Sequence, residues 1–241
     1  MDSAGSPSLG GTGLTETREV RERVLAVHAR LGEAYGIPHW TADKASDPVD
    51  ELVNTILSQN TNDRNRDAAY VQLRDRFPTW EAVRDAETGE IIDAARPAGL
   101  APTKGPRIQA ALRSITARQG EISLEFLRDW PLDEARRWLL DLDGVGPKTA
   151  AIVLLFAMGR PAFPVDTHVH RVSRRIGLIP PSTSREKAHV LLEELVPGSL
   201  FYPFHLNVIR HGRQVCAART PQCDACTLHD ICDYGEGLSQ E

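Results

Sequence analysis

LLDLDGVGPKTAAIVLLFAMGRPAFPVDTHVHR, residues 139–171, is the stretch that decides how the rest of the chain folds. A helix is expected to end at the tight turn 144–146. A second helix is expected to begin at Pro147, because the fixed φ of proline suits the first helical position. The residues that follow are mostly apolar until Gly159, which closes this helix. The pattern therefore predicts a helix–hairpin–helix.

The two glycines of the turn, Gly144 and Gly146, flank one small apolar residue. Glycine permits backbone conformations that other residues rarely adopt, so amide N–H groups can point outward at the start of the second helix. The helix dipole adds partial positive charge at the same place. Such a turn is expected to bind a phosphate group without reading base sequence.

Lys148 lies in the first turn of the second helix, where the dipole disfavours its ammonium form and burial would disfavour it further. A lysine placed in this way is a candidate amine nucleophile. Eighteen residues later, Asp166 stands at the expected start of another helix, and a carboxylate close to a poised amine makes a reacting pair. The alternatives are a solvated lysine and an aspartate that only caps a helix.

Length and composition bound the class of protein. The chain has 241 residues, of which 41% are hydrophobic and 25% charged, as in a soluble protein with one large or two small domains. No run approaches the roughly 18–20 apolar residues that span a bilayer, and the N-terminus lacks the pattern of a signal peptide. We therefore expect a cytoplasmic protein with no membrane partner.

The charge is unevenly distributed along the chain. The formal net charge is −5, but residues 160–219 carry nine Lys and Arg against four acidic residues. One basic face on an acidic body suits an enzyme that scans DNA better than a protein that coats it. The alternative is an ordinary solvated helix face.

Hydrophobic periodicity indicates an all-α fold, because nearly every segment repeats at helical spacing and no alternating strand pattern is sustained. The Gly/Ser-rich tail, residues 1–16, has too few apolar groups to order itself and is expected to be disordered. Helices are expected at 17–35, 47–57, 64–77, 80–85, 88–96, 108–118, from 131 to the hairpin turn, and at 147–158, 166–176, 184–195 and 201–211.

All four cysteines lie in the last 26 residues, separated by six, two and five residues. Disulfides are rare in cytosolic chains, so metal binding is the leading interpretation. Four thiolates can hold either a tetrahedral zinc ion or an iron–sulfur cluster, and the residues alone leave both open. The expected ligands are Cys216, Cys223, Cys226 and Cys232.

The combination of LDGVGPKTA with VDTH at this spacing resembles the endonuclease III family of DNA glycosylases, in the helix–hairpin–helix superfamily. The segment HGRQVCAARTPQCDACTLHDICDY, residues 211–234, resembles the 4Fe-4S cluster loop of that family, including all three gaps. The resemblance implies two helical lobes with a DNA-binding cleft between them. Residues 42–159 would form a six-helix domain with the hairpin, and residues 17–41 and 160–235 the iron–sulfur cluster domain.

The activity that the resemblance implies is that of a bifunctional DNA glycosylase/AP lyase of base excision repair. Lys148 would attack the sugar carbon C1′ of a flipped nucleotide as the damaged base departs, and Asp166 would stabilise positive charge on the sugar. The resulting Schiff base would lead to strand cleavage by β-elimination. The implied substrates are oxidised pyrimidines or abasic sites in double-stranded DNA, and we expect a nucleoid-associated monomer.

The resemblance also implies a set of DNA-binding residues. In the family, a loop glutamine fills the space left by the extruded base, and Asn60 stands at its position here, with Gln59 one residue earlier. Leu100 would be an apolar wedge in the base stack and Lys104 would lie near a phosphate. A polar loop and an ordinary core leucine are the alternatives. The whole set is Gln59, Asn60, Leu100, Lys104, Gly144, Gly146, His168, Arg171 and Arg219.

Two departures from the family leave the substrate range open. Leu140 stands where relatives have an acidic pocket residue, and Asp143 replaces a common proline. One alternative is a mismatch glycosylase of the same superfamily, which Lys148 disfavours. Another is a non-catalytic DNA-binding or redox-sensing protein, which would bind DNA without cleaving it, and an electron-transfer protein is a third.

Overall fold

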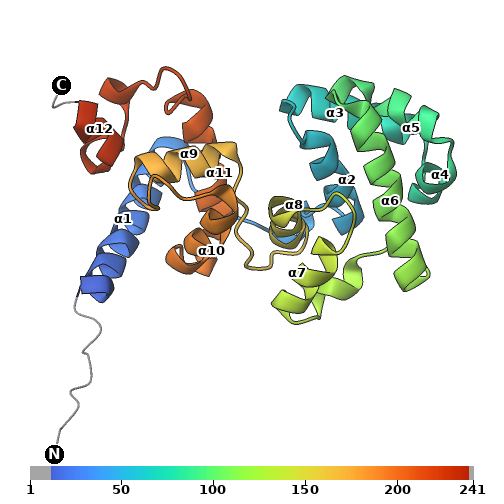
Figure 1. The fold of residues 1–241 in the computed structure, drawn as a ribbon, viewed down its shortest axis with the longest axis horizontal. Helices are drawn as coiled ribbons and strands as arrows, with labels where there is room; N and C mark the ends of the chain where they lie inside the picture. Colours follow the sequence, from blue (N-terminus) through green and yellow to red (C-terminus); the bar gives the residue numbers. More distant parts are fainter. Residues whose placement is uncertain (1–11, 239–241) are drawn as a thin grey trace, which may run out of the picture. The chain divides into compact units, whose positions relative to one another are not determined.

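The computed structural model describes residues 12–238, and all regular structure in that range is helical, which confirms the all-α class. The chain divides into two compact units (Figure 1). The central unit is His39–Pro164. The terminal unit combines the chain up to Pro38 with the chain from Val165. Among the described helices, none has both the length and the apolar character needed to cross a membrane.

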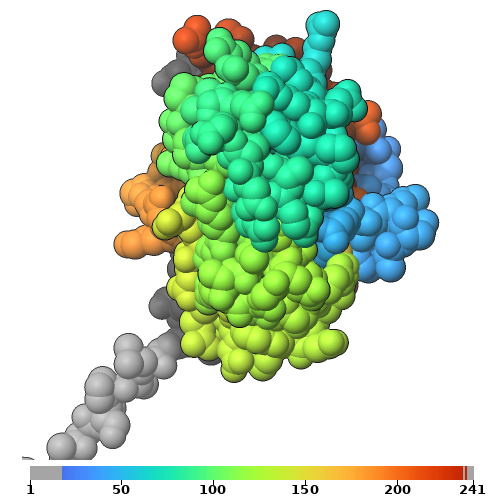
Figure 2. Space-filling view, turned by 90° about the vertical axis from the view of Figure 1, so that its right-hand side faces the viewer, coloured from blue at the N-terminus to red at the C-terminus, as the bar shows by residue number. Residues whose placement is uncertain are grey.

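The central unit holds the hairpin and the helices that support it. Figure 2 shows the side of this unit whose surface is formed by the segments from α3 to α7, coloured from cyan to yellow-green. The elements in chain order are η1 (Ala42–Lys44), α2 (Pro48–Ser58), α3 (Asp63–Arg76), α4 (Trp80–Asp85), α5 (Thr88–Ala95), η2 (Arg96–Ala98), α6 (Ala101–Gln119), η3 (Glu125–Arg128), α7 (Leu132–Leu140), α8 (Pro147–Ile152) and η4 (Val153–Ala157).

Local caps start several of these helices where the sequence predicts them. The Asp47 side chain accepts from the amides of Val49 and Asp50, and the Thr79 hydroxyl accepts from the amide of Ala82. Each cap satisfies amides that have no partner inside their own helix. The long helix α6 then packs against α2, α4 and α5, and its large apolar side chains, Ile108, Leu112 and Ile115, are fully buried in the core of the unit.

The second helix of the hairpin differs from the prediction in its last turns. We expected one helix over 147–158, but α8 is α-helical only to Ile152 and continues as a π-helical turn, η4. Gly159 ends it with φ 66°, and its amide donates to the Leu155 carbonyl. The amide of Arg160 donates to the Leu154 carbonyl, six residues earlier, which is one residue wider than in a Schellman motif. Nothing local in the apolar run signals the π turn.

The terminal unit is built from both ends of the described chain. Its helix α11 packs against α1 and α9. Helix α1 begins at Thr12 rather than the expected Thr17, because extending a formed helix costs little. The rest of the expected disordered tail, residues 1–11, lies outside the described residues. The elements are α1 (Thr12–Tyr35), α9 (Thr167–Arg175), α10 (Arg185–Leu195), η5 (Gly198–Leu200), α11 (Phe201–Gln214), η6 (Cys223–Ala225), η7 (His229–Ile231) and α12 (Asp233–Leu238).

Candidate functional site

The hairpin turn is fixed to the core by Val145, its central residue, and is open to solvent at Gly146, its last residue. The amide of Val145 donates to the Leu142 carbonyl at 3.1 Å, and the Val145 side chain is buried, with 6% of its surface exposed. Helix α8 then starts at Pro147, and the Gly146 carbonyl accepts from the amide of Ala150 at 3.0 Å. The turn therefore holds the first amides of α8 in a fixed place.

The two glycines of the turn are required for different reasons. Gly144 has φ 80°, and a β-carbon there would come within 2.9 Å of the Arg107 side chain. Gly146 has an ordinary φ of −97°, and a β-carbon there would meet nothing within 4 Å. The fold itself thus needs Gly144 but not Gly146. The space beside Gly146 is open, as a phosphate seat would require.

Lys148 is the second residue of α8 and is half-buried. The next residues, Thr149 and Ala150, are buried, which fixes the start of the helix on the core of the central unit. The amine therefore comes from a rigid element, directly after the open position at Gly146. This is the placement that an amine nucleophile next to a phosphate seat needs.

Asp166 is the N-cap residue of α9, and its Oδ1 accepts from the amide of Val169 at 2.7 Å. The capping interpretation is thus correct as a description of this oxygen. A carboxylate has a second oxygen, and the side chain is only half-buried. The cap fixes the orientation of the group, so capping and a chemical role are compatible.

His168, on the same helix, is held as a neutral imidazole. Burial lowers its pKa and the Arg171 and Arg213 charges lower it further, while the Asp166 charge and a hydrogen bond with the Gly212 backbone oppose them. Arg171 Nη2 lies 3.1 Å from Nδ1 of His168. A neutral imidazole donates one hydrogen bond and accepts one.

Arg171 is half-buried and makes hydrogen bonds inside the terminal unit, and its expected contact to DNA stays a prediction. Its Nε and Nη2 donate to the Cys216 carbonyl at 3.1 and 3.0 Å, and Nη2 also donates to the Gly212 carbonyl at 2.8 Å. Arg175 acts likewise on the carbonyls of Ala217 and Ala218. Helix α9 thereby holds the start of the cysteine segment.

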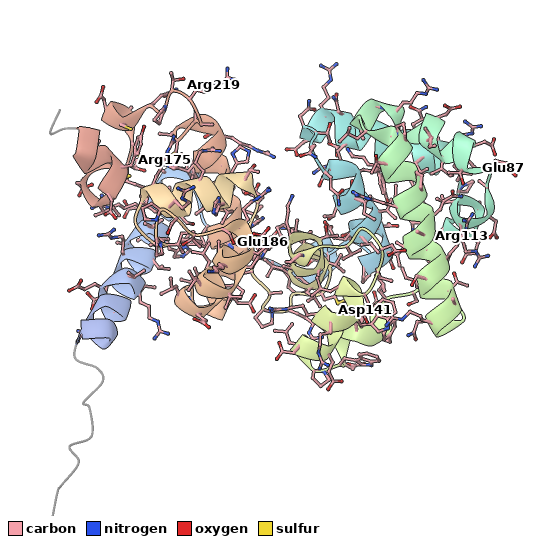
Figure 3. All side chains as sticks on the ribbon, in the orientation of Figure 1. Glu87, Arg113, Asp141, Arg175, Glu186 and Arg219 are labelled. Atoms are coloured by element: carbon pink, nitrogen blue, oxygen red, sulfur yellow. The ribbon has the colours of Figure 1, made fainter. Side chains whose placement is uncertain are left out.

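Arg219 stands apart from these two arginines. It lies on the loop that follows α11, and its side chain is exposed, whereas Arg175 on α9 is half-buried (Figure 3). The exposure of Arg219 is compatible with the expected phosphate contact, which stays a prediction.

The four cysteines are free thiols brought together at the end of the chain. Burial raises the pKa of three of them, and the neighbouring thiols raise it further. Among the described residues, no three His, Cys, Asp or Glu side chains converge on a single-ion site. The three with raised pKa values are Cys223, Cys226 and Cys232, and each is within electrostatic reach of Cys216.

Hydrogen-bond donors surround the sulfur atoms. Arg175 Nη1 donates to Cys216 Sγ at 3.3 Å, and the Leu228 amide donates to Cys226 Sγ at 3.4 Å. His211 Nε2 lies 3.5 Å from the same Cys226 sulfur. Such donors stabilise thiolate ligands, and thiolates that repel one another are stabilised by a cationic centre. The donor set therefore fits an iron–sulfur cluster held by four cysteines.

Two exposed loops carry the residues expected to enter the base stack. Asn60 is exposed with φ 52°, and Leu100 is 57% exposed with φ 50°. Leu100 is therefore not the ordinary core residue that was its alternative. Gln59 is half-buried, and its Oε1 accepts from Arg107 Nη1 at 3.1 Å.

The expectation for Lys104 is wrong. The side chain is 1% exposed, and its Nζ donates to the carbonyls of Leu57 at 2.7 Å and Ala98 at 2.8 Å. Burial lowers the pKa of its ammonium group. It is too deeply buried to contact a phosphate. The sequence also gave no role to Arg107, which contacts both Gln59 and the site of Gly144; its helical spacing from Lys104 was the available signal.

Comparisons with known proteins agree with this geometry. The family model described as HhH-GPD superfamily base excision DNA repair protein matches residues 53–198. Endonuclease III of Thermotoga maritima is 32% identical over 191 residues, 79% of this chain and 85% of that protein. A relative from Arabidopsis thaliana with a DNA glycosylase name is 36% identical over 70% of this chain, which spans 57% of its length. A solved structure of a trapped endonuclease III–DNA covalent intermediate superposes with a TM-score of 0.78 at 26% identity, covering 91% of this chain and 98% of that one.

The structural role of Asp166 can be separated from any chemical one. Replacing Asp166 by alanine removes the acceptor of the Val169 amide and is expected to lower the free energy of unfolding of the terminal unit by about 1 kcal/mol. Asp166→Asn keeps an oxygen at the cap and should change it by only roughly a few tenths of a kcal/mol. Urea unfolding of both variants checks this. An equal loss in the two would mean that the carboxylate charge, and not the cap, stabilises α9.

Proposed function

The chain belongs to the HhH-GPD superfamily of base excision DNA repair proteins, and we propose that it acts as a bifunctional DNA glycosylase/AP lyase on double-stranded DNA. The observation that carries the proposal is the position of Lys148 in the first turn of α8, directly after the open space at Gly146. Purely hydrolytic chemistry would not require an amine at that position. The substrates that we propose are oxidised pyrimidines and abasic sites.

The proposed reaction starts with attack of the neutral Lys148 amine on C1′ of a flipped nucleotide. The bond from C1′ to the base breaks, and the base leaves with its electron pair and takes up a proton. Asp166 stabilises positive charge on the sugar and accepts the proton that the amine loses. Ring opening yields a Schiff base, which acidifies the adjacent C2′ proton. Loss of that proton expels the 3′ phosphate, which is β-elimination.

The remaining site residues bind and orient the DNA in this proposal. The Gly146 amide and the amides in the first turn of α8 bind a backbone phosphate, while His168 and the exposed Arg219 provide further phosphate contacts. The exposed Leu100 enters the base stack as a wedge. Gln59 and Asn60 fill the space that the extruded nucleotide leaves. Asn60 is a shorter amide than the family glutamine, so its side chain reaches less far into the duplex.

We further propose that Cys216, Cys223, Cys226 and Cys232 hold a 4Fe-4S cluster. The donors from Arg175 and the Leu228 amide to the sulfur atoms support it. When bound, such a cluster crosslinks the end of the chain and offers a centre that can gain or lose an electron. The loop that carries Arg219 lies between the first two ligands, so the cluster would hold this arginine in place.

Borohydride trapping tests the nucleophile. Borohydride reduces a Schiff base to a stable amine, so the wild-type chain should become covalently attached to damaged DNA during turnover. Lys148→Gln should abolish the attached species, as measured by gel shift under denaturing conditions. Asp166→Asn should still form it, but slower by roughly two to three orders of magnitude. Undiminished trapping in Lys148→Gln would place the nucleophile elsewhere, and DNA binding without any cleavage would favour a non-catalytic protein.

The phosphate seat is tested at Gly146. Gly146→Val introduces a side chain into space that the fold leaves open, so stability should be unchanged. Binding to intact and damaged duplexes should weaken alike, by about tenfold or more, since a hydrogen bond to a charged group contributes about 1.5–3 kcal/mol. Fluorescence anisotropy measures both affinities. The matched control is Gly89→Val, at another glycine that faces open space. Weakening on damaged duplexes alone would show that the hairpin reads more than backbone.

The cluster makes its own prediction. Protein purified without oxygen should be yellow-brown, contain about four iron atoms per chain and release sulfide in acid. Changing Cys226 to serine should loosen the residues after His211 before it disturbs the central unit, because this segment is too short to have its own core. Hydrogen exchange measures the difference. Colourless protein with one stoichiometric zinc ion would contradict the cluster and leave the glycosylase proposal standing.

A further inference from the structure

Two residues hold a strained backbone on the exposed surface of the central unit. In the part of the chain that the structure describes, Asn60 and Leu100 are the two non-glycine residues with left-handed φ, at 52° and 50°. L-residues rarely adopt this conformation, and they keep it only where the surrounding structure enforces it. Neither side chain is fixed by burial, since both are exposed. The constraint must therefore act through the backbone.

One buried ammonium group lies behind both loops. Lys104 Nζ donates to the carbonyl of Leu57, in the last turn of α2 and three residues before Asn60. The same Nζ donates to the carbonyl of Ala98, two residues before Leu100. The C-terminal end of a helix carries partial negative charge, which favours a cation at Leu57. A single side chain thus joins two segments that are distant in sequence.

The backbone of the same residue holds Leu100 from the other side. The amides of Thr103 and Lys104 donate to the Leu100 carbonyl at 2.9 and 3.0 Å. One turn later on α6, Arg107 reaches the Gln59 side chain and packs over Gly144 of the hairpin. The first two turns of α6 therefore connect the two loops with the hairpin turn, all within the central unit.

We propose that Lys104 is a positioning residue that fixes the two loops carrying Gln59, Asn60 and Leu100 in their inserting conformation before DNA binds. A methionine of similar length could fill the same space, so a buried charge is not needed for packing. What the ammonium adds is a pair of hydrogen bonds that sets the separation of Leu57 and Ala98. The effect of Lys104 on DNA binding rests on the proposed function, whereas its effect on the order of the two loops in the free protein does not.

Ordering the loops in advance affects only complexes in which they are inserted. Without Lys104 the loops would have to become ordered on binding, and that cost reduces affinity for duplexes with an extruded nucleotide. Binding to an intact duplex through the hairpin does not require insertion. Lys104 should therefore act on the selectivity for damaged DNA and not on general affinity.

The matched pair of variants is Lys104→Met and Gln109→Met. Gln109 lies on the same helix, is equally buried at 1%, and its Nε2 donates to the carbonyls of Val83 at 3.0 Å and Ala86 at 2.9 Å. Both changes remove a buried side-chain donor from α6: Lys104 makes two such hydrogen bonds, and Gln109 makes a third, to the Arg84 carbonyl at 3.4 Å. Hydrogen exchange of the free proteins should show faster exchange at 58–62 and 98–104 in Lys104→Met alone. Equal exchange of these segments in the two variants would overturn the proposal.

Affinity measurements test the consequence. The probes are a duplex with a tetrahydrofuran abasic-site analogue and the same duplex intact. Lys104→Met should reduce the preference for the abasic duplex on the order of 10- to 100-fold, and Gln109→Met should leave it unchanged. In a Leu100→Ala background, Lys104→Met should have a smaller further effect, because part of its action passes through Leu100 and the rest through the loop with Gln59 and Asn60. Independent, multiplying effects of the two changes would overturn the proposal.

The wild-type chain provides a test that needs neither a folded variant nor DNA. The amides of Thr61 and Lys104 donate to the carbonyls of Ser58 and Leu100. They should exchange as slowly as amides in the middle of α6. Rapid exchange at these positions would overturn the proposal whatever the variants do. A chain with slow exchange but no preference for abasic DNA would instead overturn the proposed function and leave the role of Lys104 standing.

Discussion

The first amides of an α-helix have no partner inside that helix, and the arrangement of the central unit depends on how this constraint is met at α8. The protein supplies no side chain at Gly146, and open space lies beside it. The buried Val145 and the buried start of α8 fix the amides on the core. Lys148 is carried by the same turn, so its amine is held in a fixed relation to them. The proposed phosphate seat and the proposed nucleophile thus share one rigid support.

Most of the fold could be predicted because its signals are local. Asp47, Thr79 and Pro147 start helices where the sequence places them, since a cap depends on residues two or three positions away. The π turn after Ile152, the short helix α12 and the first turns of α6 were not predicted, and α6 begins at Ala101 where a turn was expected as far as residue 108. No local signal marks the π turn, and the glycines and prolines of the other two segments favour turns.

The site was predictable to the extent that its residues belong to a contiguous motif. The roles of Lys148 and Asp166 could be proposed from sequence, whereas Lys104 was misplaced and the backbone partners of Arg171 were not predicted. The acceptors of Lys104 lie 47 and 6 residues away, and the Cys216 carbonyl lies 45 residues from Arg171. Spacing along the chain does not reveal such partners. The sequence alone therefore does not show whether a basic residue in a DNA-binding protein donates to backbone carbonyls inside the fold or to a phosphate of the DNA.

The terminal unit is assembled from chain segments that the ribosome produces far apart in time. Asn207 donates to the Gly36 carbonyl across 171 residues, and α1 buries Val24, Val27 and Leu31 in a unit whose other helices begin only at Thr167. At a synthesis rate of about 5–20 residues per second, roughly 10 to 30 s pass between the synthesis of α1 and that of α11. The whole central unit is synthesised during that interval. During this time the apolar face of α1 lacks its native partners and is exposed to solvent. The speed of translation and the access of chaperones to α1 therefore affect how much active protein a cell obtains.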